Sequence, residues 1–333
     1  MSKELFSKEI DMSFLKKNVD RSGNYSHYKK ICKEIASQEK VLVSCPICDT
    51  FNKPRNIFIS VYGLEYIKCS KCSHVYQDYL PTEEQQYLNS TKVSKRMSKQ
   101  LYEDPSKSLY RLNEVVLPKI KFAIQEFPKN YNGKWLDVGC GTGELIKAVN
   151  DLGWYAAGID NNKSSIDFAK EKYKLDITYG DVEKTNESFF KEFDVISIFL
   201  LFEHLREPKS FFNNIAKGSK KGALIITEVN NSNSFSSLVQ KRFSKKIDRH
   251  LLPCSHTNMF TPDSINYFFN LFEFEMISEW WFGQDFYELL NALKEEEEFE
   301  NLINSLIKHS NEFQKVIDRK KASDRTIYIF KKK

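Results

Sequence analysis

Two pairs of cysteines give the chain its clearest chemical signal. Cys45 and Cys48 form one Cys-x-x-Cys pair, and Cys69 and Cys72 form a second pair after residues 49–68. A tight turn over each pair can direct both sulfur atoms at one ion, and four thiolates at this spacing suit tetrahedral zinc. Such a site has no open position, so we expect a structural zinc ion rather than a catalytic one. The alternatives are ordinary reduced thiols or a redox pair.

A glycine-rich loop gives the second signal. The run Leu-Asp-Val-Gly-Cys-Gly-Thr-Gly over 136–143 follows a predicted strand and opens a predicted helix. Gly139, Gly141 and Gly143 allow a sharp turn and a close approach of the backbone to a ligand. Glu144 stands where the dinucleotide-binding pattern requires its third glycine, and its charge would repel a pyrophosphate at the helix N-terminus. The loop also lacks the Gly-Lys-Ser/Thr of a P-loop.

Three aspartates stand at the ends of the first three predicted strands. Because the carboxyl ends of parallel strands meet at one crevice, Asp137, Asp160 and Asp181 should share a pocket. The oxygens of Asp160 suit two ribose hydroxyls, and Asp181 can accept from an adenine amino group. Asn161 and Val182 complete the predicted cofactor-binding set. An acidic pocket of this kind suits the ammonium and sulfonium of S-adenosylmethionine better than the phosphates of NAD. The alternative for each single aspartate is a cap or a turn.

The elements that must position these residues alternate between strands and helices. Strands are predicted over 135–138, 155–160, 176–179, 194–199 and 223–228, with helices over 144–150, 164–173 and 208–217 between them. This rhythm predicts an α/β fold with a doubly wound, mainly parallel, Rossmann-like sheet and helices on both faces. Two late strands are predicted over 272–280 and 325–330.

The remaining segments suggest a small front end and a larger domain. We predict a helical or partly disordered segment over 1–44, a zinc-binding knuckle over 45–80, a helical linker or lid over 81–130, and a main domain over 131–333 with insertions at 231–258 and 283–323. An amphipathic helix is predicted over 113–127. We expect the knuckle and the helices that follow it to form a lid or an oligomer surface over the crevice.

Composition argues against several classes of protein. Lys and Arg number 50 and Asp and Glu 45, a formal net charge of +5 that is too mild to indicate nucleic-acid binding. No apolar run approaches the ~20 residues that span a bilayer, and the charged start Met-Ser-Lys-Glu does not resemble a signal peptide. Seven cysteines, an odd count, argue against a full disulfide framework. We therefore expect a cytoplasmic globular protein.

Several of these segments together resemble a known family. Residues 134–230 are similar to a class I S-adenosylmethionine-dependent methyltransferase, through the glycine loop, the second strand at 153–160 and the Phe-Glu-His-Leu-Arg-Glu-Pro run at 202–208. The His-Thr-Asn-Met-Phe-Thr-Pro-Asp-Ser run at 256–264 resembles a bacterial branch of sugar and small-molecule methyltransferases. The paired cysteines look like the zinc-binding front end that many of those proteins carry. The resemblance covers about 45–92 and 113–282.

Methyl transfer to an alcohol needs a base, because neutral hydroxyls are poor nucleophiles. His204 follows the fourth predicted strand, beside the expected methyl position, and is the first candidate; it could instead shape the cofactor wall or cap the next helix. His256 lies in the insertion expected to roof the substrate pocket. Glu203 and Asp285 are lesser options.

Each of three further side chains has two possible roles. Trp280 and Trp281 could stack on a sugar ring or pack in the core. Arg111 could reach the methionine carboxylate of the cofactor or lie on the surface.

The resemblance implies an enzyme that O-methylates a small molecule, with a sugar or nucleotide-linked sugar as the acceptor. The alternatives are C-methylation of a keto-deoxysugar, RNA methylation guided by the knuckle, and a degenerate methyltransferase fold that serves as a binding subunit. No oligomeric state is predicted.

Overall fold

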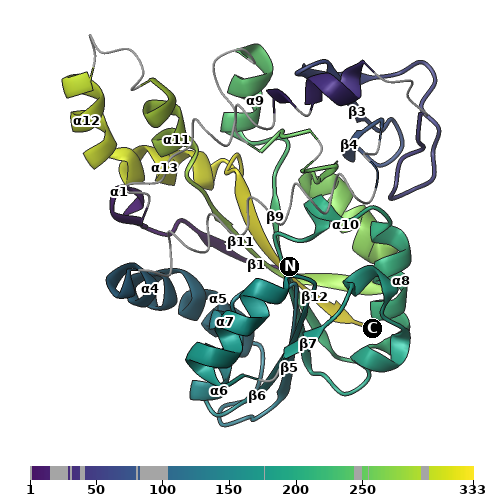
Figure 1. Cartoon of the computed structure of the whole chain (residues 1–333), viewed down its shortest axis with the longest axis vertical. Coiled ribbons are helices and arrows are strands. Elements are labelled where there is room, and N and C mark those ends of the chain that lie inside the picture. The colour runs from purple at the N-terminus through teal and green to yellow at the C-terminus, as the bar shows by residue number, and fades with distance from the viewer. Residues whose placement is uncertain are drawn as a thin grey trace.

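The structure is a computed structural model that describes residues 2–15, 29–30, 32–37, 42–79, 82, 104–175, 177–243, 250–253, 255–293 and 300–333 (Figure 1). Residues 83–103 of the predicted linker or lid lie outside the described residues.

A single eight-stranded sheet forms the centre of the molecule. Its strands are β1 (Lys3–Phe6), β5 (Lys134–Val138), β6 (Tyr155–Asp160), β7 (Ile177–Tyr179), β8 (Val195–Phe199), β9 (Leu224–Asn230), β11 (Phe274–Phe282) and β12 (Arg325–Lys332). They are ordered β1-β11-β12-β9-β8-β5-β6-β7. The pairs from β7 to β9 are parallel, and β12 is antiparallel to both of its neighbours. The predicted doubly wound, mainly parallel sheet is therefore confirmed.

The strand order reverses beside β5, which pairs with β6 on one side and with β8 on the other. In such sheets the connections on either side of this point leave to opposite faces, so a crevice opens outside the carboxyl ends of the two strands. The glycine loop leaves β5 at this point, and the fold therefore places it at the expected ligand crevice.

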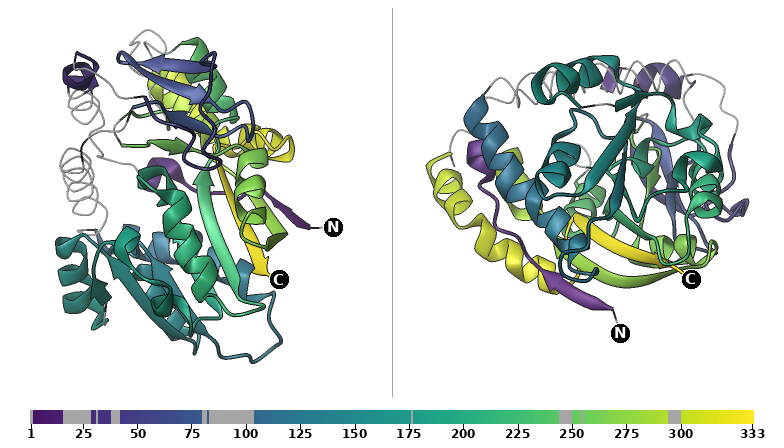
Figure 2. Two further views of the ribbon diagram at one scale, coloured as in Figure 1. Left: turned by 90° about the vertical axis from the view of Figure 1, so that its right-hand side faces the viewer. Right: turned by 90° about the horizontal axis from the view of Figure 1, so that it is seen from below.

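Helices cover both faces of the sheet (Figures 1 and 2). One face carries α5 (Leu117–Ile124), α6 (Glu144–Asp151) and α7 (Lys163–Tyr173), whose apolar residues form one core cluster with the strands. The other face carries α8 (Pro208–Gly218) and α10 (Pro262–Asn270), which contribute to a second cluster. None of the helices among the described residues combines the length and apolarity that a bilayer crossing requires.

The helix before the first predicted strand has different bounds from the predicted ones. The predicted helix over 113–127 begins earlier, with α4 (Pro105–Arg111), and continues through a π-helical turn at Leu112–Val116 into α5. Asp104 caps α4, because its side chain accepts a hydrogen bond from the backbone N–H of Ser106.

The N-terminal segment differs from the prediction of helix or partial disorder. Residues Lys3–Phe6 form β1, which adds in parallel to the edge of β11 from Lys3 opposite Ser278 to Phe6 opposite Trp281. Four mostly exposed residues give no alternating pattern in the sequence. The open edge of β11, which offers unpaired backbone groups, decides the strand conformation instead.

The two insertions carry most of the remaining elements. Residues 231–258 include α9 (Phe235–Arg242) and the start of β10 (Asn258–Met259), and residues 283–323 include α11 (Asp285–Ala292), α12 (Glu300–Lys308) and α13 (Ser310–Arg319). The described structure of the first 44 residues also includes the short helix α1 (Met12–Leu15).

The knuckle forms a second, smaller sheet. Its strands are β2 (Ile57–Val61), β3 (Leu64–Lys68) and β4 (Val75–Gln77), all antiparallel. The fourth strand of this sheet is β10, which comes from the insertion in the main domain and pairs with β4. The front end therefore shares a sheet with the domain behind it.

A group of phenylalanines anchors the loop after β8. Phe202 belongs to η4 (Phe202–His204), a short 3₁₀ turn, and is fully buried. Its ring lies within about 6 Å, centroid to centroid, of five others: Phe211, Phe212, Phe260, Phe268 and Phe269. These rings come from α8, α10 and the residue after β10, so one side chain ties three elements to the turn.

We expect the Phe202→Ala variant to lower the free energy of unfolding by about 3–5 kcal/mol, because it leaves a cavity among rings that cannot collapse around it. Urea unfolding followed by tryptophan fluorescence measures the change. Leu238→Ala is the control, since Leu238 is 53% exposed on α9 and should cost less than about 0.5 kcal/mol. Equal midpoints for the two variants would show that Phe202 does not anchor the turn.

Candidate functional site

The glycine loop is open where a ligand would approach it. Gly139, Gly141 and Gly143 all have positive φ angles, of 75°, 53° and 74°. A Cβ atom on Gly141 would meet nothing within 4 Å, whereas one on Gly143 would lie 2.7 Å from Cδ1 of Leu175. Gly143 is therefore required for packing, and Gly141 faces open space at the crevice.

Asp160 holds this loop in shape. Its Oδ2 accepts a hydrogen bond of 2.8 Å from the backbone N–H of Gly141, and its Oδ1 accepts one of 2.7 Å from Asn162. Burial raises the pKa of the Asp160 carboxyl above its usual value, and the two backbone donors oppose that rise. Asn161 lies beside it and is exposed.

Asp137 lies in the same buried region, where β5 ends. It is 5% exposed, and its Oδ1 accepts a hydrogen bond of 2.5 Å from the hydroxyl of Ser197. Burial raises the pKa of Asp137 to about 7; the Ser197 hydrogen bond opposes the rise and the charge of Asp160 adds to it. Among the described residues neither carboxylate forms an ion pair, and the charge of Lys119 only partly offsets the rise in the pKa of Asp137. A cation bound between Asp137 and Asp160 would offset the cost of burying the negative charge of both carboxylates.

Asp181 has the capping role that was the alternative for each aspartate. It precedes η2 (Val182–Lys184), and its Oδ1 accepts a hydrogen bond of 3.0 Å from the backbone N–H of Glu183. Its Oδ2 lies 3.3 Å from Nζ of Lys184. Val182, the next residue, is buried. Asp181 thus closes the strand β7 locally, with 38% of its side chain still exposed for a further contact.

The structure brings the two candidate bases together. The rings of His204 and His256 lie 5.0 Å apart, centroid to centroid, with an edge-to-face tilt of 64°. Nδ1 of His204 lies 2.7 Å from the carbonyl oxygen of Ser255, and Nδ1 of His256 lies 2.6 Å from the carbonyl oxygen of His250. Since a carbonyl only accepts, each Nδ1 must carry a hydrogen, and Nε2 is then the accepting nitrogen of each neutral ring. Burial lowers the pKa of His204, which favours this neutral form.

Glu203, a lesser option, is deeply buried beside the pair. It is 1% exposed, and its Oε1 accepts a hydrogen bond of 3.1 Å from the backbone N–H of Asn230. Burial raises its pKa to about 7. Nearby, Glu228 is fully buried but pairs with Lys119 and lies 3.6 Å from Nη1 of Arg325, so its pKa is lowered despite burial.

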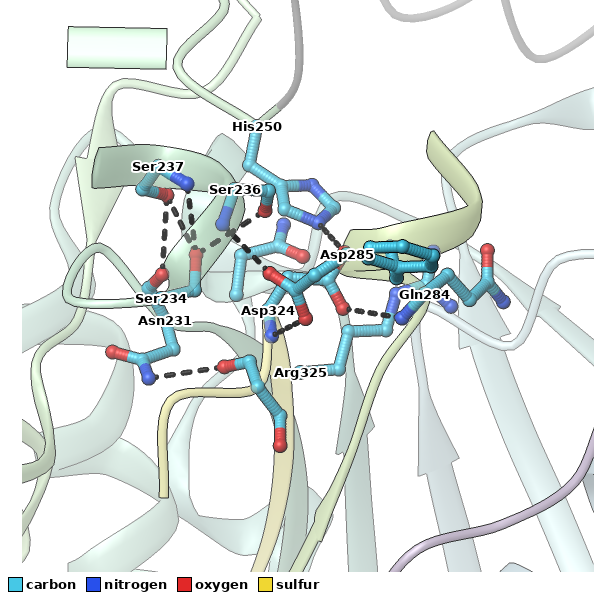
Figure 3. A network of polar contacts seen from close by, with 12 residues as sticks. Asn231, Ser234, Ser236, Ser237, His250, Gln284, Asp285, Asp324 and Arg325 are labelled. Atoms are coloured by element: carbon cyan, nitrogen blue, oxygen red, sulfur yellow. Dashed lines mark hydrogen bonds and ion pairs between the residues drawn. The ribbon is translucent and has the colours of Figure 1, made fainter. Parts of the chain in front are cut away.

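Asp285, the other lesser option, has a structural role. Figure 3 shows it within a polar network that joins the two insertions. Its Oδ1 accepts from the backbone N–H of Ser236, and its Oδ2 accepts from the backbone N–H of Asp324 and from Nε2 of Gln314. These three hydrogen bonds make Asp285 a link between the two insertions.

The same network contains a histidine and a carboxylate that the sequence analysis missed. Nε2 of His250 lies 3.1 Å from Oδ2 of Asp324 (Figure 3). The carbonyl oxygen of His250 also faces Nδ1 of His256. His250 and Asp324 are 74 positions apart in the chain. No spacing in the sequence signals this pair, because only the packing of the two insertions brings it together.

Burial and pairing bear on the tryptophans and on Arg111. Trp280 and Trp281 are 4% and 1% exposed and pack in the core, so they are not a stacking platform for a sugar. Nε of Arg111 donates to Oε2 of Glu144 at 2.8 Å, which places this arginine at the first turn of α6, next to the glycine loop.

The four paired cysteines converge on one point. Their sulfur atoms all lie within 4.8 Å of one another, with Cys45 and Cys72 at 3.6 Å and Cys48 and Cys69 at 3.5 Å. A tetrahedron with Zn–S bonds of about 2.3 Å has edges of about 3.8 Å, so the donor set fits zinc. The hydrogen bond from Cys45 lowers the pKa of Cys72, and that neighbouring sulfur with burial raises the pKa of Cys45. The four sulfur atoms could hold a metal ion.

A cavity of about 510 Å³ separates the knuckle from α8. Carboxamides of Gln77, Asn213 and Asn258 line it together with the rings of Tyr76 and Phe272. Its charged residues balance: Arg206 and Lys209 stand against Asp49 and Glu207. The cavity adjoins the segment that follows His256.

Comparisons with known proteins agree with this geometry. A protein-family model described as a methyltransferase domain matches residues 110–279, just over half of the chain. A ubiquinone biosynthesis O-methyltransferase from Coxiella burnetii (strain Dugway 5J108-111) is 33% identical over 132 residues, which cover 38% of this chain and 54% of that protein. One of the same description from Pelagibacter ubique (strain HTCC1062) is 33% identical over 123 residues, covering 36% and 51%. The chain thus spans about half the length of the curated relatives it matches.

One solved structure shows the shared fold. The magnesium protoporphyrin IX methyltransferase from Synechocystis PCC 6803, solved with bound S-adenosylhomocysteine, superposes with a TM-score of 0.50 at 13% identity, over 76% of this chain and 99% of that one. The match of the family model over half of the chain, on a sheet of the expected order, shows that the chain belongs to the class I S-adenosylmethionine-dependent methyltransferase family.

Proposed function

We propose that the protein transfers a methyl group from S-adenosylmethionine to a hydroxyl of a small molecule. The observation that carries this is the pair of buried carboxylates, Asp137 and Asp160, beside an open glycine loop and without a cation of their own among the described residues. When bound, the cofactor supplies an electrophilic methyl group on a sulfonium. The residues of the chain would bind and orient the cofactor and accept the proton that the acceptor hydroxyl loses.

The residues present fit this cofactor. Asp160, with Asn161 beside it, would accept from the ribose hydroxyls, because each carboxylate oxygen has a second lone pair beyond its backbone bond. The negative charge of Asp137 would favour the cationic end. Gly139, Gly141 and Gly143 would let the backbone approach, and Asp181 and Val182 would contact the adenine, which stays a prediction from the sequence.

His204 or His256 would take the acceptor's proton. Backbone carbonyls fix the tautomer of both rings, which makes Nε2 the proton-accepting atom in each. Their contact means that one ring can hold the acceptor while the other serves as the base. Glu203, neutralised by burial near pH 7, lines the same region.

The acceptor we favour is a sugar or a nucleotide-linked sugar. The resemblance of 256–264 to sugar methyltransferases supports it, and a cavity with carboxamides, two rings and balanced charge beside this segment suits a polyhydroxylated molecule. The names of the curated relatives favour a second candidate, an acceptor used in ubiquinone biosynthesis. Both candidates require O-methylation.

The four cysteines, we propose, hold one structural zinc ion. The fit of the sulfur distances to a tetrahedron supports this, and with four protein ligands the ion keeps no open position for chemistry. His74 is not needed as a ligand, because its Nε2 already meets Oδ1 of Asn258 at 3.2 Å.

The affinity for S-adenosylmethionine should rise between pH 5.5 and 7.5. The pKa of Asp137 is raised to about 7, so its carboxyl is neutral below that pH and becomes the negative partner of a cationic ligand above it. Asp137→Asn should weaken binding and remove most of this pH dependence, as measured by calorimetry. Asp167→Asn, which changes an exposed charge on α7, is the control. Affinity that falls as pH rises, or that keeps its full pH dependence in Asp137→Asn, would overturn this role.

Incubation with S-adenosylmethionine and a panel of acceptors should release S-adenosylhomocysteine in the presence of a sugar nucleotide. A catecholic quinone precursor tests the second candidate, and structured RNA tests the alternative from the sequence. In the active reaction, His204→Gln or His256→Gln should lower kcat about 10²–10⁴-fold, since one of them removes the base. Turnover should rise with pH through the lowered pKa of His204 and then level off.

Donor affinity in both histidine variants should stay as in the wild type, which separates proton transfer from binding. Full turnover in both variants would exclude the pair as the base. If the protein binds the donor but turns over none of the acceptors, only the proposed class of acceptor is wrong. If it does not bind the donor, the proposed methyltransferase activity is wrong.

The purified protein should contain about one zinc ion per chain, released by a strong chelator. Cys45→Ser and Cys72→Ser should lose the ion, and Cys32→Ser should retain it, because Cys32 is buried elsewhere with its sulfur against the carbonyl oxygen of Pro253. Atomic absorption provides the measurement. A metal-free protein with four titratable thiols would show the cysteines to be a reduced cluster.

A further inference from the structure

The segment that carries His256 is held on two sides. It consists of residues 256–258, and the backbone N–H and carbonyl groups of both His256 and Thr257 have partners outside the segment. One side is the small sheet of the knuckle, and the other is the turn η4 that carries His204. The position of the imidazole thus depends on both.

On the knuckle side, three contacts reach the segment. The hydroxyl of Tyr66, a fully buried residue of β3, donates to the carbonyl oxygen of His256 at 2.7 Å. The backbone N–H of Gln77 donates to the carbonyl oxygen of Thr257 at 2.9 Å. Asn258 then pairs with Tyr76 as the first residue of β10. The Tyr66 contact is the one that acts directly on His256.

On the η4 side, the contacts fix the distance to His204. The backbone N–H of Thr257 donates to the carbonyl oxygen of Glu203 at 2.8 Å, and Nδ2 of Asn258 donates to that of Leu205 at 2.6 Å. These two acceptors flank His204 in the chain. The segment is therefore clamped so that the two imidazoles touch.

The cysteines control the strands that make up the knuckle side of this clamp. The hairpin of β3 and β4 has the second cysteine pair as its turn: Cys69 directly follows β3, and β4 begins three residues after Cys72. Tyr66 lies three residues before Cys69. A metal ion that ties this turn to Cys45 and Cys48 would fix the direction of both strands.

We propose that Tyr66 is a positioning residue for methyl transfer, and that the four-cysteine module holds His256 against His204 through it. The inference rests on the proposed function for the role of the histidines, but not for the clamp itself. The cofactor pocket lies at the ends of β5 and β6 and shares none of these contacts. Disturbing the clamp should therefore change the imidazoles and leave donor binding intact.

The test compares Tyr66→Phe with Tyr76→Phe in the zinc-loaded full chain. Both remove one buried hydroxyl from the same sheet, but the hydroxyl of Tyr76 accepts from Nδ2 of Asn52 rather than holding His256. NMR spectra of protein with labelled histidine rings, assigned through single histidine variants, report each imidazole and its titration. We expect Tyr66→Phe to shift the signals and the titration midpoint of His256, and the signals of its ring neighbour His204. Tyr76→Phe should move neither.

Zinc content and the calorimetric Kd for S-adenosylmethionine should stay within about twofold of the wild type in both variants. Where an acceptor is known, Tyr66→Phe should lower kcat about three- to tenfold, the equivalent of one net hydrogen bond, with KM for the donor unchanged. Removing zinc with a chelator should shift the same imidazole signals further.

Imidazole signals and midpoints in Tyr66→Phe that match those of the wild type would overturn the inference, and so would equal shifts in Tyr76→Phe. Loss of donor binding and of the imidazole signals together on zinc removal would also overturn it, because the module would then stabilise the whole fold. A wild type that binds no donor would defeat the proposed function alone, since the imidazole comparison would still test the clamp.

Discussion

Negative charge buried along the carboxyl edge of the sheet is the constraint on which the site depends. A carboxylate taken out of water is costly unless hydrogen bonds or a cation compensate it. Cations compensate the buried charge of Glu228, which faces Lys119 and Arg325. Hydrogen-bond donors compensate that of Asp285, which accepts three hydrogen bonds. Beside the glycine loop, Asp137 and Asp160 accept hydrogen bonds but form no ion pair among the described residues. A cationic ligand completes that third case, which is the physical reason for preferring a sulfonium donor to a dinucleotide.

The two histidines that we propose as proton acceptors depend on a different kind of interaction. His204 and His256 lie 52 positions apart in the chain, so only the packing of the fold decides whether their rings meet. Phe202 and Phe260, which flank them, are in ring contact in the core cluster. Each histidine therefore stands next to a buried anchor, and the same aromatic cluster that closes one face of the sheet also sets the distance between the rings.

How much of this the sequence could reveal depends on the range of the interactions. The glycine loop, the strand ends and the cysteine pairs are local signals: each is written in a few consecutive residues, and the main sheet follows from the alternation of strands and helices. The strand β1 was missed because its conformation comes from the edge of β11, far along the chain. The pair His250 and Asp324 was missed for the same reason. Burial, which decides that Trp281 packs in the core, is likewise a property of the fold.

The knuckle illustrates why a module with a clear local signature can still be misjudged as a separate unit. Its own apolar cluster is small, and it includes Leu251 and Met259 from the insertion alongside Tyr66 and Val75 from the knuckle strands. A segment of this size cannot bury enough apolar surface alone, and metal ligation is one common way to compensate. Here the shared strand β10 ties the hairpin to the main domain, and the proposed metal ion would fix the turn of that hairpin. A front end that shares its core with Leu251 and Met259, on either side of His256, also constrains where the residues between them lie, which is the physical basis for the proposed role of the knuckle in positioning His256.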